Sequence, residues 1–331
     1  MSSILALTRD GILCSRAVYV AAALGIPDRL KDGPRTAEEL ADLVHAHAPS
    51  LRRVLRFLAG RGLFHEDARG RFRLTPLGDT LRSDRADSTR PLALFWNDDY
   101  RWRAYGDVLH AVATGQTAVE HLYGAPIFEF LSAHPEHARG FDAAMTAVST
   151  HAIPAVLDAY DFRRIRVLVD VGGGQGSLLA GILRAHPGMR GVLVDLPPVA
   201  ARARERFEGS PLGDRLSVTG GDMFESVPSG GDAYVLRKVL HDWDDGRASQ
   251  ILRTCRRAMA KGARLLLVEG IVPPRNVPSP VRTLDLGMLL MTGGRERTAA
   301  EFRGLLQAAG FRLLRIVPTR AGDSVIEARA A

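Results

Sequence analysis

A short apolar run that ends in a cluster of glycines constrains the fold of this chain more than any other feature. Residues 167–176 read Val-Leu-Val-Asp-Val-Gly-Gly-Gly-Gln-Gly, and apolar residues at helical spacing resume over residues 177–183. The run is typical of a buried parallel strand, and glycines allow a tight turn that a ligand can approach closely. A helix N-terminus behind the turn adds free N–H groups. The segment predicts a strand–turn–helix unit that binds a nucleotide-like cofactor.

The spacing of the glycines argues against a dinucleotide site. A dinucleotide-binding loop has the pattern G-x-G-x-x-G, but Ser177 stands at the third glycine position. The pattern is instead D-x-G-x-G-x-G, formed by Asp170, Gly172, Gly174 and Gly176. An ordinary strand–turn–helix connection beside unrelated acids is the alternative interpretation.

Acidic residues also follow the next two predicted strands. Asp195 ends the strand 191–195 and precedes Leu196, and its carboxylate suits a pair of ribose hydroxyls. Asp222 and Met223 follow the strand 216–219, where a carboxylate beside apolar side chains suits the amino group and ring of adenine. Together with the glycine turn, these acids predict a site for an adenosyl cofactor.

The second half of the chain alternates between strands and helices. Strands are predicted near residues 167–171, 191–195, 216–219, 233–237, 264–268, 311–317 and 324–328. This alternation predicts an α/β fold with a doubly wound, largely parallel sheet covered by helices on both faces. Ligands of such sheets lie beyond the carboxyl ends of the strands. Gly172, Asp195, Asp222 and His241 all fall there.

The first hundred residues are predicted to be mostly helical. Thr36 and Glu39 form a capping box that opens one helix, and Ser50 precedes another over residues 51–59. Residues 62–66 and 70–74 are predicted to form a hairpin. This order is typical of a winged helix-turn-helix. We therefore expect a winged-helix domain at residues 1–100, a helical bridge at 101–160 and a catalytic domain at 161–331.

A winged helix also raises the alternative of a DNA-binding regulator, with Arg52, Arg53 and Arg56 on its recognition helix. The chain has a net charge of +7. However, basic and acidic residues are nearly balanced over residues 1–110, which is a weak electrostatic footprint for DNA. We therefore expect no nucleic-acid partner.

Three further segments are distinctive: residues 234–245 (Tyr-Val-Leu-Arg-Lys-Val-Leu-His-Asp-Trp-Asp-Asp), 195–198 (Asp-Leu-Pro-Pro) and 293–298 (Gly-Gly-Arg-Glu-Arg-Thr). With the glycine turn, they make the chain resemble S-adenosylmethionine-dependent methyltransferases of the caffeate type, which methylate small phenolic molecules. The resemblance runs from about residue 10 to the C-terminus. It implies a Rossmann-like sheet, S-adenosylmethionine as cofactor and an aromatic substrate, such as a bacterial polyketide intermediate. It also implies that the winged-helix domain dimerises rather than binds DNA.

The resemblance identifies His241 as the general base. Methyl transfer needs an acceptor oxygen held in line with the methyl group, and a phenol with a pKa near ~10 needs help in losing its proton. Neutral imidazole suits this task. Glu269 and Glu296 match the acids that flank the base in the family, and we expect them to orient the imidazole. A relative of this scaffold that catalyses hydroxylation or decarboxylation is the enzymatic alternative.

Further site residues either match positions of the same family or, like Asp285 and Met288 of the predicted helix 281–291, are expected near the rim of the pocket. Besides the glycine turn and the acids above, the cofactor residues are Ser149, Arg237 and Trp243, with Arg237 where the family usually has lysine. Lys238 is expected to point to the opposite face of its strand. The substrate residues are Phe141, Met145, Asp242, Asp285 and Met288, of which Asp242 also stabilises its turn. No metal site is expected, which disfavours the magnesium-dependent catechol methyltransferases.

Other features concern assembly and location. The apolar residues Leu5, Leu13, Val18, Val20 and Leu24 are expected to lie exposed on the N-terminal helices and to be buried in a homodimer. The chain lacks a run of ~18 apolar residues and a basic-then-apolar leader, so we expect a cytoplasmic protein that does not contact membranes. The two cysteines are expected to be buried thiols. The residues leave the acceptor, and O- versus N- or C-methylation, open.

Overall fold

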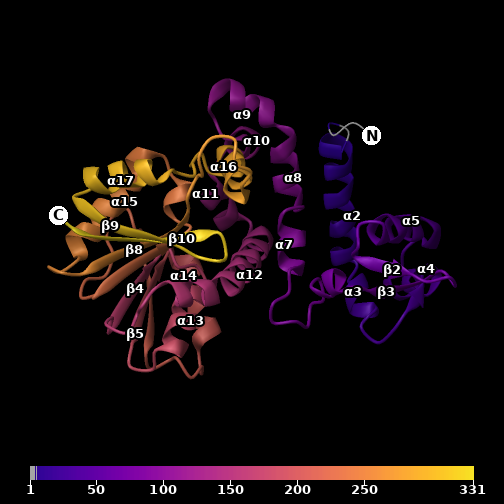
Figure 1. Cartoon of the computed structure of the whole chain (residues 1–331), viewed down its shortest axis with the longest axis horizontal. Helices are drawn as coiled ribbons and strands as arrows, with labels where there is room; N and C mark the ends of the chain where they lie inside the picture. Colours follow the sequence, from indigo (N-terminus) through magenta and orange to yellow (C-terminus); the bar gives the residue numbers. More distant parts are fainter. Residues whose placement is uncertain (1–3, 5) are drawn as a thin grey trace. The chain divides into compact units, whose positions relative to one another are not determined.

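The computed structural model describes residue 4 and residues 6–331, and the chain divides into two compact units (Figure 1). The first unit comprises the residues up to Trp102 together with Arg139–Ala147. The second comprises Arg103–Ala138 and Val148–Ala331. The long helix α12 (Pro135–Ala159) therefore contributes residues to both units. Nowhere in the described residues is a helix both long enough and apolar enough to span a bilayer.

The first unit has the predicted order of helices followed by a hairpin. Its elements are η1 (Ala6–Asp10), α2 (Gly11–Ala23), α3 (Ile26–Arg29), β1 (Arg35–Thr36), α4 (Ala37–Val44), α5 (Ala48–Ala59), β2 (Phe64–Glu66), β3 (Arg71–Leu74), α6 (Pro76–Asp79), α7 (Arg90–Phe95) and the start of α8 (Asp99–Gly106). The strands form a small sheet in the order β1-β3-β2. The capping box at Thr36 and Glu39 is present. Helix α5 begins at Ala48 rather than after Ser50, because Pro49 is well tolerated in the first turn of a helix.

The apolar residues predicted for the N-terminal helices are only partly exposed. Leu13 is 50% exposed, whereas Val18 and Leu24 are partly buried against the core of their own unit. Val20 is half-buried, and Leu5 lies outside the described residues. The sequence identifies these residues as apolar, but it does not show which side of α2 packs against the core of the unit.

Two of the three arginines proposed for a recognition helix have acidic partners in the first unit. Arg52 donates to Glu38, and Arg56 Nε donates to Glu66 Oε1 at 3.0 Å. These ion pairs reduce the positive charge that α5 offers to a phosphate backbone. They weaken the DNA-binding alternative.

The second unit is built on a seven-stranded sheet in the order β6-β5-β4-β7-β8-β10-β9. All pairings are parallel except those of β10, which runs antiparallel to both of its neighbours. The strands are β4 (Val167–Val171), β5 (Arg190–Asp195), β6 (Leu216–Gly220), β7 (Ala233–Arg237), β8 (Arg264–Gly270), β9 (Phe311–Pro318) and β10 (Asp323–Ala330). The doubly wound, largely parallel sheet predicted from the sequence is confirmed.

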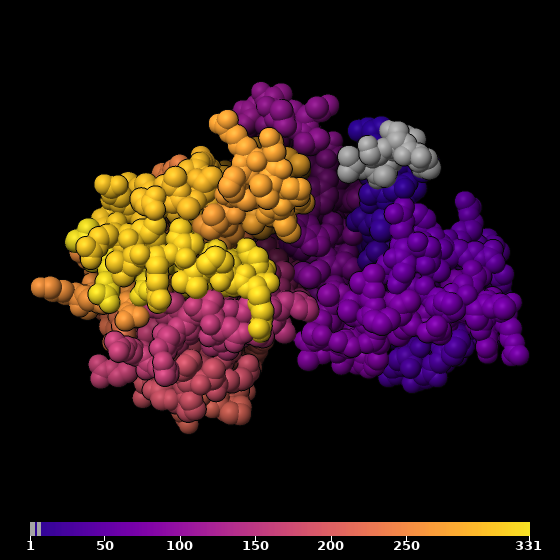
Figure 2. All heavy atoms as spheres, viewed as in Figure 1, coloured from indigo at the N-terminus to yellow at the C-terminus, as the bar shows by residue number. Residues whose placement is uncertain are grey.

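Helices cover both faces of this sheet (Figure 1). Apolar side chains of α15 (Asp245–Ala258) and α17 (Ala299–Ala308) form one core with one face of the sheet. Side chains of α12, α13 (Ser177–Ala185) and α14 (Pro197–Phe207) form a second core with the other face. The C-terminal residues, yellow in Figure 2, form much of the visible surface of this unit. The remaining elements are α9 (Val108–Thr114), α10 (Ala118–Tyr123), α11 (Ile127–Ala133), η2 (Leu240–Asp242) and α16 (Pro280–Met291).

Candidate active site

Apart from Gln175, the turn after β4 consists of glycines, and its conformation requires them. Gly172, Gly174 and Gly176 have φ values of 67°, 58° and 67°, in the left-handed region that favours glycine. A Cβ on Gly173 would lie only 2.6 Å from the carboxylate of Asp170. The turn thus presents bare backbone at the carboxyl end of a central strand, ahead of the N-terminus of α13.

The acids after β5 and β6 lie where the sequence predicted them. Asp195 Oδ2 accepts a hydrogen bond from Gly174 N at 2.7 Å, and its Oδ1 accepts one from Leu196 N at 2.8 Å. Asp195 therefore links the glycine turn to the next loop. In the loop after β6, Asp222 Oδ1 accepts from Phe224 N at 2.8 Å, and Met223 packs against the core.

Asp170 is a buried carboxyl group that lacks a polar partner. Its side chain is almost fully buried, and neither oxygen has a hydrogen-bond partner among the described residues. Burial and the charge of Asp195 raise the pKa of this carboxyl to about 7. Arg237 partly offsets the shift. A buried acceptor of this kind suits a cationic group of a ligand.

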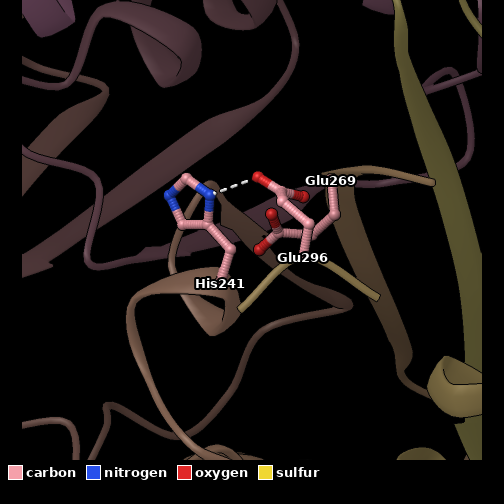
Figure 3. Close-up of side chains that lie close together, drawn as sticks. All are labelled: His241, Glu269 and Glu296. Atoms are coloured by element: carbon pink, nitrogen blue, oxygen red, sulfur yellow. Dashed lines mark hydrogen bonds and ion pairs between the residues drawn. The ribbon is translucent and has the colours of Figure 1, made fainter. Parts of the chain in front are cut away.

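His241 lies in the short helix η2, close to Glu269 and Glu296 (Figure 3). Its side chain is almost completely buried. Its Nδ1 is 2.7 Å from Glu296 Oε1, and its Nε2 is 3.7 Å from Asp242 Oδ1. Burial alone would lower the pKa of the imidazole, but the charges of Asp242, Glu296 and Glu269 outweigh it and raise the pKa to about 8. The pKa of Glu296 is lowered, despite burial, by His241 and Lys238. Glu296 is therefore an acceptor, and Nδ1 holds the proton.

Glu269, at the end of β8, supports the segment that carries His241. Its Oε1 accepts hydrogen bonds from the backbone N–H groups of Val239 at 3.1 Å and Leu240 at 3.0 Å. Burial raises the pKa of Glu269. Asp285, in α16, accepts a hydrogen bond from Glu296 N at 2.8 Å, so this predicted substrate residue also supports the acid beside the base.

Ligand atoms of His241, Glu269 and Glu296 lie within 4.8 Å of one another. One imidazole and two carboxylates also form a common donor set for a divalent cation. Here, the ammonium of Lys238 already stands 3.6 Å from Glu296 Oε1 and supplies positive charge to the group. That the site needs no metal stays a prediction.

The chain turns sharply between β7 and His241. Strand β7 ends at Arg237, and Lys238 has a φ of 53°, which is rare for a residue other than glycine. Because of this turn, Lys238 and Arg237 reach the same residue, Asp323, with Lys238 Nζ 3.1 Å from Oδ1 and Arg237 Nη2 3.8 Å from Oδ2. The prediction that Lys238 points away from Arg237 is wrong, because strand alternation stops one residue earlier.

Arg237 and Trp243 line the same edge of the sheet. Arg237 Nη1 donates to Ser149 Oγ at 2.8 Å. The ring of Trp243 meets Phe224 edge-on at 4.8 Å, and its buried Nε1 has no hydrogen-bond partner among the described residues. The guanidinium of Arg237 and the indole N–H of Trp243 can therefore both donate hydrogen bonds to a ligand.

The predicted substrate residues fall in both units. Met288 is buried in α16 of the second unit. Phe141 and Met145 belong to the first unit, where the ring of Phe141 packs edge-on against Phe95 at 5.8 Å. Their contact with substrate stays a prediction.

Sequence reasoning missed Arg297, which clamps the turn that carries His241. Its guanidinium is fully buried and donates to Leu240 O at 2.8 Å, Trp243 O at 2.8 Å and Asp245 Oδ1 at 2.9 Å. A Cβ on Gly294 would lie 2.1 Å from His241 O, so only glycine allows this close approach. The motif Gly-Gly-Arg-Glu-Arg-Thr could have indicated this role of Arg297. One catalytic acid alone would not require the glycines and arginines around it.

Known proteins match this chain over nearly its whole length. The model of the O-methyltransferase domain matches residues 102–312, and that of the O-methyltransferase dimerisation domain matches residues 8–84. The chain is 46% identical over 329 residues to phenazine O-methyltransferase PhzM of Lysobacter antibioticus, covering 99% of this chain and 96% of that protein. It is 40% identical over 319 residues to 8-amino-8-demethylriboflavin N,N-dimethyltransferase of Streptomyces davaonensis, covering 94% and 90%.

Solved structures agree with these matches. The crystal structure of LaPhzM has a TM-score of 0.94 and 44% identity, covering 99% of this chain and 98% of that one. The O-methyltransferase NcsB1 from neocarzinostatin biosynthesis, solved with S-adenosylmethionine and 2-hydroxy-5-methyl naphthoic acid, has a TM-score of 0.83 and 35% identity, covering 100% and 99%. The chain therefore belongs to the family of S-adenosylmethionine-dependent O-methyltransferases that carry an N-terminal dimerisation domain.

Proposed function

We propose that this protein transfers the methyl group of S-adenosylmethionine to a phenolic hydroxyl of an aromatic natural-product intermediate, with His241 as the general base. The observation that carries the proposal is the hydrogen bond of buried His241 to Glu296 at the sheet edge that also holds the glycine turn. Relatives that act on phenazine and naphthoate rings support an aromatic acceptor.

The residues around the glycine turn suit the cofactor. The unpartnered carboxyl of Asp170 would accept from its ammonium group, Asp195 from its ribose hydroxyls and Asp222 from its adenine amino group. The bare turn leaves room for the backbone to approach its methionine part. Further contacts are proposed for Ser149, Leu196, Met223, Arg237 and Trp243. When bound, the cofactor supplies an electrophilic methyl carbon.

The protein's own part is to hold the acceptor and to take its proton. Glu296 fixes the tautomer with hydrogen on Nδ1, which leaves the lone pair of Nε2 to accept the phenolic proton. Glu269 fixes the backbone behind the imidazole. The burial of His241 should keep water away from the acceptor oxygen, which is the nucleophile of the proposed reaction. The proposed walls of the acceptor site are Phe141, Met145, Asp242, Asp285 and Met288.

Methyl transfer from labelled S-adenosylmethionine to a library of phenols tests this proposal. Replacement of His241 by alanine should lower turnover by ~10²–10⁴-fold, the usual contribution of a general base. Calorimetry should find the affinity for S-adenosylhomocysteine nearly unchanged, which separates loss of the base from loss of the fold. Near-normal turnover of the variant, on a phenol with a pKa well above the assay pH, would refute the role of His241.

N-methylation is the second candidate, because the chain is also 40% identical to an N,N-dimethyltransferase. An amine uses its own lone pair as the nucleophile and needs no base to create it. Matched acceptors that differ only in a hydroxyl or an amino group on the same ring discriminate the two. We expect the labelled methyl group on oxygen. Methylation of the amine alone would overturn the proposal in favour of the second candidate.

A further inference from the structure

A chain of hydrogen bonds and ion pairs between polar side chains connects the predicted cofactor residues to His241. It begins at Ser149, which accepts a hydrogen bond from Arg237, and passes from Arg237 to Asp323 at the start of β10. Asp323 Oδ1 lies 3.1 Å from Lys238 Nζ. Each link joins atoms of different elements of the second unit.

Lys238 is the centre of this chain. Its Nζ lies 3.6 Å from Glu296 Oε1, the same oxygen that is 2.7 Å from His241 Nδ1. The side chain of Glu296 is 0% exposed, that of Asp323 13% and that of Lys238 15%. The three charges therefore interact with little screening by water.

The backbone of Lys238 adopts a conformation that costs free energy. A non-glycine residue with a φ of 53° is disfavoured relative to the ordinary helical region, because its Cβ comes close to a carbonyl oxygen of the backbone. Such conformations persist where surrounding contacts maintain them, often at functional sites. Here, the ion pairs of Lys238 with Asp323 and Glu296 are the contacts that stabilise this backbone conformation.

We propose that Lys238 is a positioning residue that holds Glu296 and opposes protonation of His241, and that Asp323 balances its charge. This inference rests on the proposed role of His241 as base. Lys238 competes with the imidazole for the same carboxylate oxygen of Glu296. Asp323 competes with Glu296 for Lys238 and thereby limits that effect.

The charge balance around His241 explains why such a residue is needed. The groups that face the cluster are Asp242 from its own turn, Glu269 from β8, Asp285 from α16, Glu296, Lys238, Arg237 and Asp323. With a pKa of about 8, the imidazole is mostly protonated at pH 7 and cannot accept a proton. Although burial opposes its charge, Lys238 remains an ammonium because Glu269, Asp323 and Glu296 raise its pKa. Without that ammonium, the acids would favour the imidazolium even more.

Nuclear magnetic resonance of the full-length protein labelled at histidine measures the titration of His241 directly, with His241→Gln to assign its signal. Lys238→Met should raise the pKa of His241 by about one unit, because a neighbouring positive charge is lost. Asp323→Asn should lower this pKa, because a negative charge is lost and Lys238 is freed for Glu296. Lys238→Arg should restore most of the normal value. Lys261→Met, at an exposed lysine before the amino end of β8, is the matched control.

Opposite shifts of the pKa of His241 in the two variants distinguish an effect of charge from structural damage. Damage to the fold has no reason to raise this pKa in one variant and lower it in the other. The rise of kcat/KM with pH should occur at higher pH in Lys238→Met and at lower pH in Asp323→Asn. An unchanged titration of His241 in both variants, with the fold intact, overturns the inference. Shifted titrations with an unshifted activity profile support the inference and count instead against His241 as the base.

Discussion

At the scale of single residues, the proposed chemistry depends on which nitrogen of His241 holds a proton. Glu296 accepts from Nδ1 and so leaves Nε2 for the acceptor. Together with Asp242 and Glu269, the same carboxylate raises the pKa of the imidazole above its ordinary value of 6.5, although burial opposes the rise. A stronger base gains affinity for the phenolic proton, but it is less often free of its own proton at neutral pH.

This balance predicts how activity depends on pH. Because the neutral imidazole is the active form and its pKa is about 8, kcat/KM should rise with pH through about 8. The measurement is kcat/KM between pH 6 and 10 with an acceptor whose ionisation lies above this range. The rise should be absent in His241→Ala, which should respond only to ionisation of the acceptor. A profile already flat above pH 6 would contradict the assignment.

Asp170 predicts a conflict between stability and cofactor binding. Its pKa of about 7 lies above the ordinary 3.8, so the folded protein binds this proton more tightly than the unfolded chain. The stability of the unliganded protein should therefore fall as the pH rises from about 4 to 7. Asp170→Asn should remove this loss and stabilise the unliganded protein at pH 8, by on the order of 2–4 kcal/mol.

The same substitution should weaken binding of S-adenosylhomocysteine, because a neutral amide is a poorer partner for an ammonium group. Denaturant unfolding at pH 5 and pH 8, together with calorimetry, measures both effects. Asp214→Asn, at an exposed acid, is the control. Lower stability and unchanged affinity in Asp170→Asn would show that the carboxyl is only a structural element.

At the scale of elements, the site is made where two connections meet: the turn from β7 through η2 and the segment of residues 293–298. Sequence patterns predicted the strands and the acids at their ends, because short apolar runs and glycine turns are local signals. They did not predict the positive φ of Lys238 or the burial of Arg297. Both depend on contacts between segments more than 50 residues apart, such as that of Arg297 with Leu240.

Arg297 therefore allows a test at this scale. Arg297→Met removes a buried cation that donates to four acceptors, so the free energy of unfolding should fall by about 3 kcal/mol. Turnover should also fall, since the turn that carries His241 loses its clamp. Arg295→Met is the matched control in the same motif, because Arg295 is 44% exposed and pairs with Glu301 at the surface. That variant should lose less than about 1 kcal/mol. Equal losses in the two variants, measured by denaturant unfolding, would contradict the clamp.

At the scale of the whole molecule, the match to an O-methyltransferase dimerisation domain over residues 8–84 predicts a homodimer. The first unit offers apolar surface for it, since Ile12 and Leu13 at the start of α2 are 56% and 50% exposed. Burial of such side chains favours association by about 25 cal/mol for each Å² removed from water. Because Val18 and Leu24 pack against the core of the unit, we expect the interface to include the first turns of α2.

Light scattering at micromolar concentration should therefore give twice the 35.9 kDa of one chain. Replacing Ile12 and Leu13 together by glutamate should shift the protein towards the monomer, because two charges cannot be buried without partners. Leu314→Glu is the control: this residue of the second unit is 39% exposed, and its variant should remain dimeric. A wild-type protein that stays monomeric would refute the dimer. A dimer that survives both glutamates would instead place the interface on another surface of the chain, and the apolar start of α2 would need a different explanation.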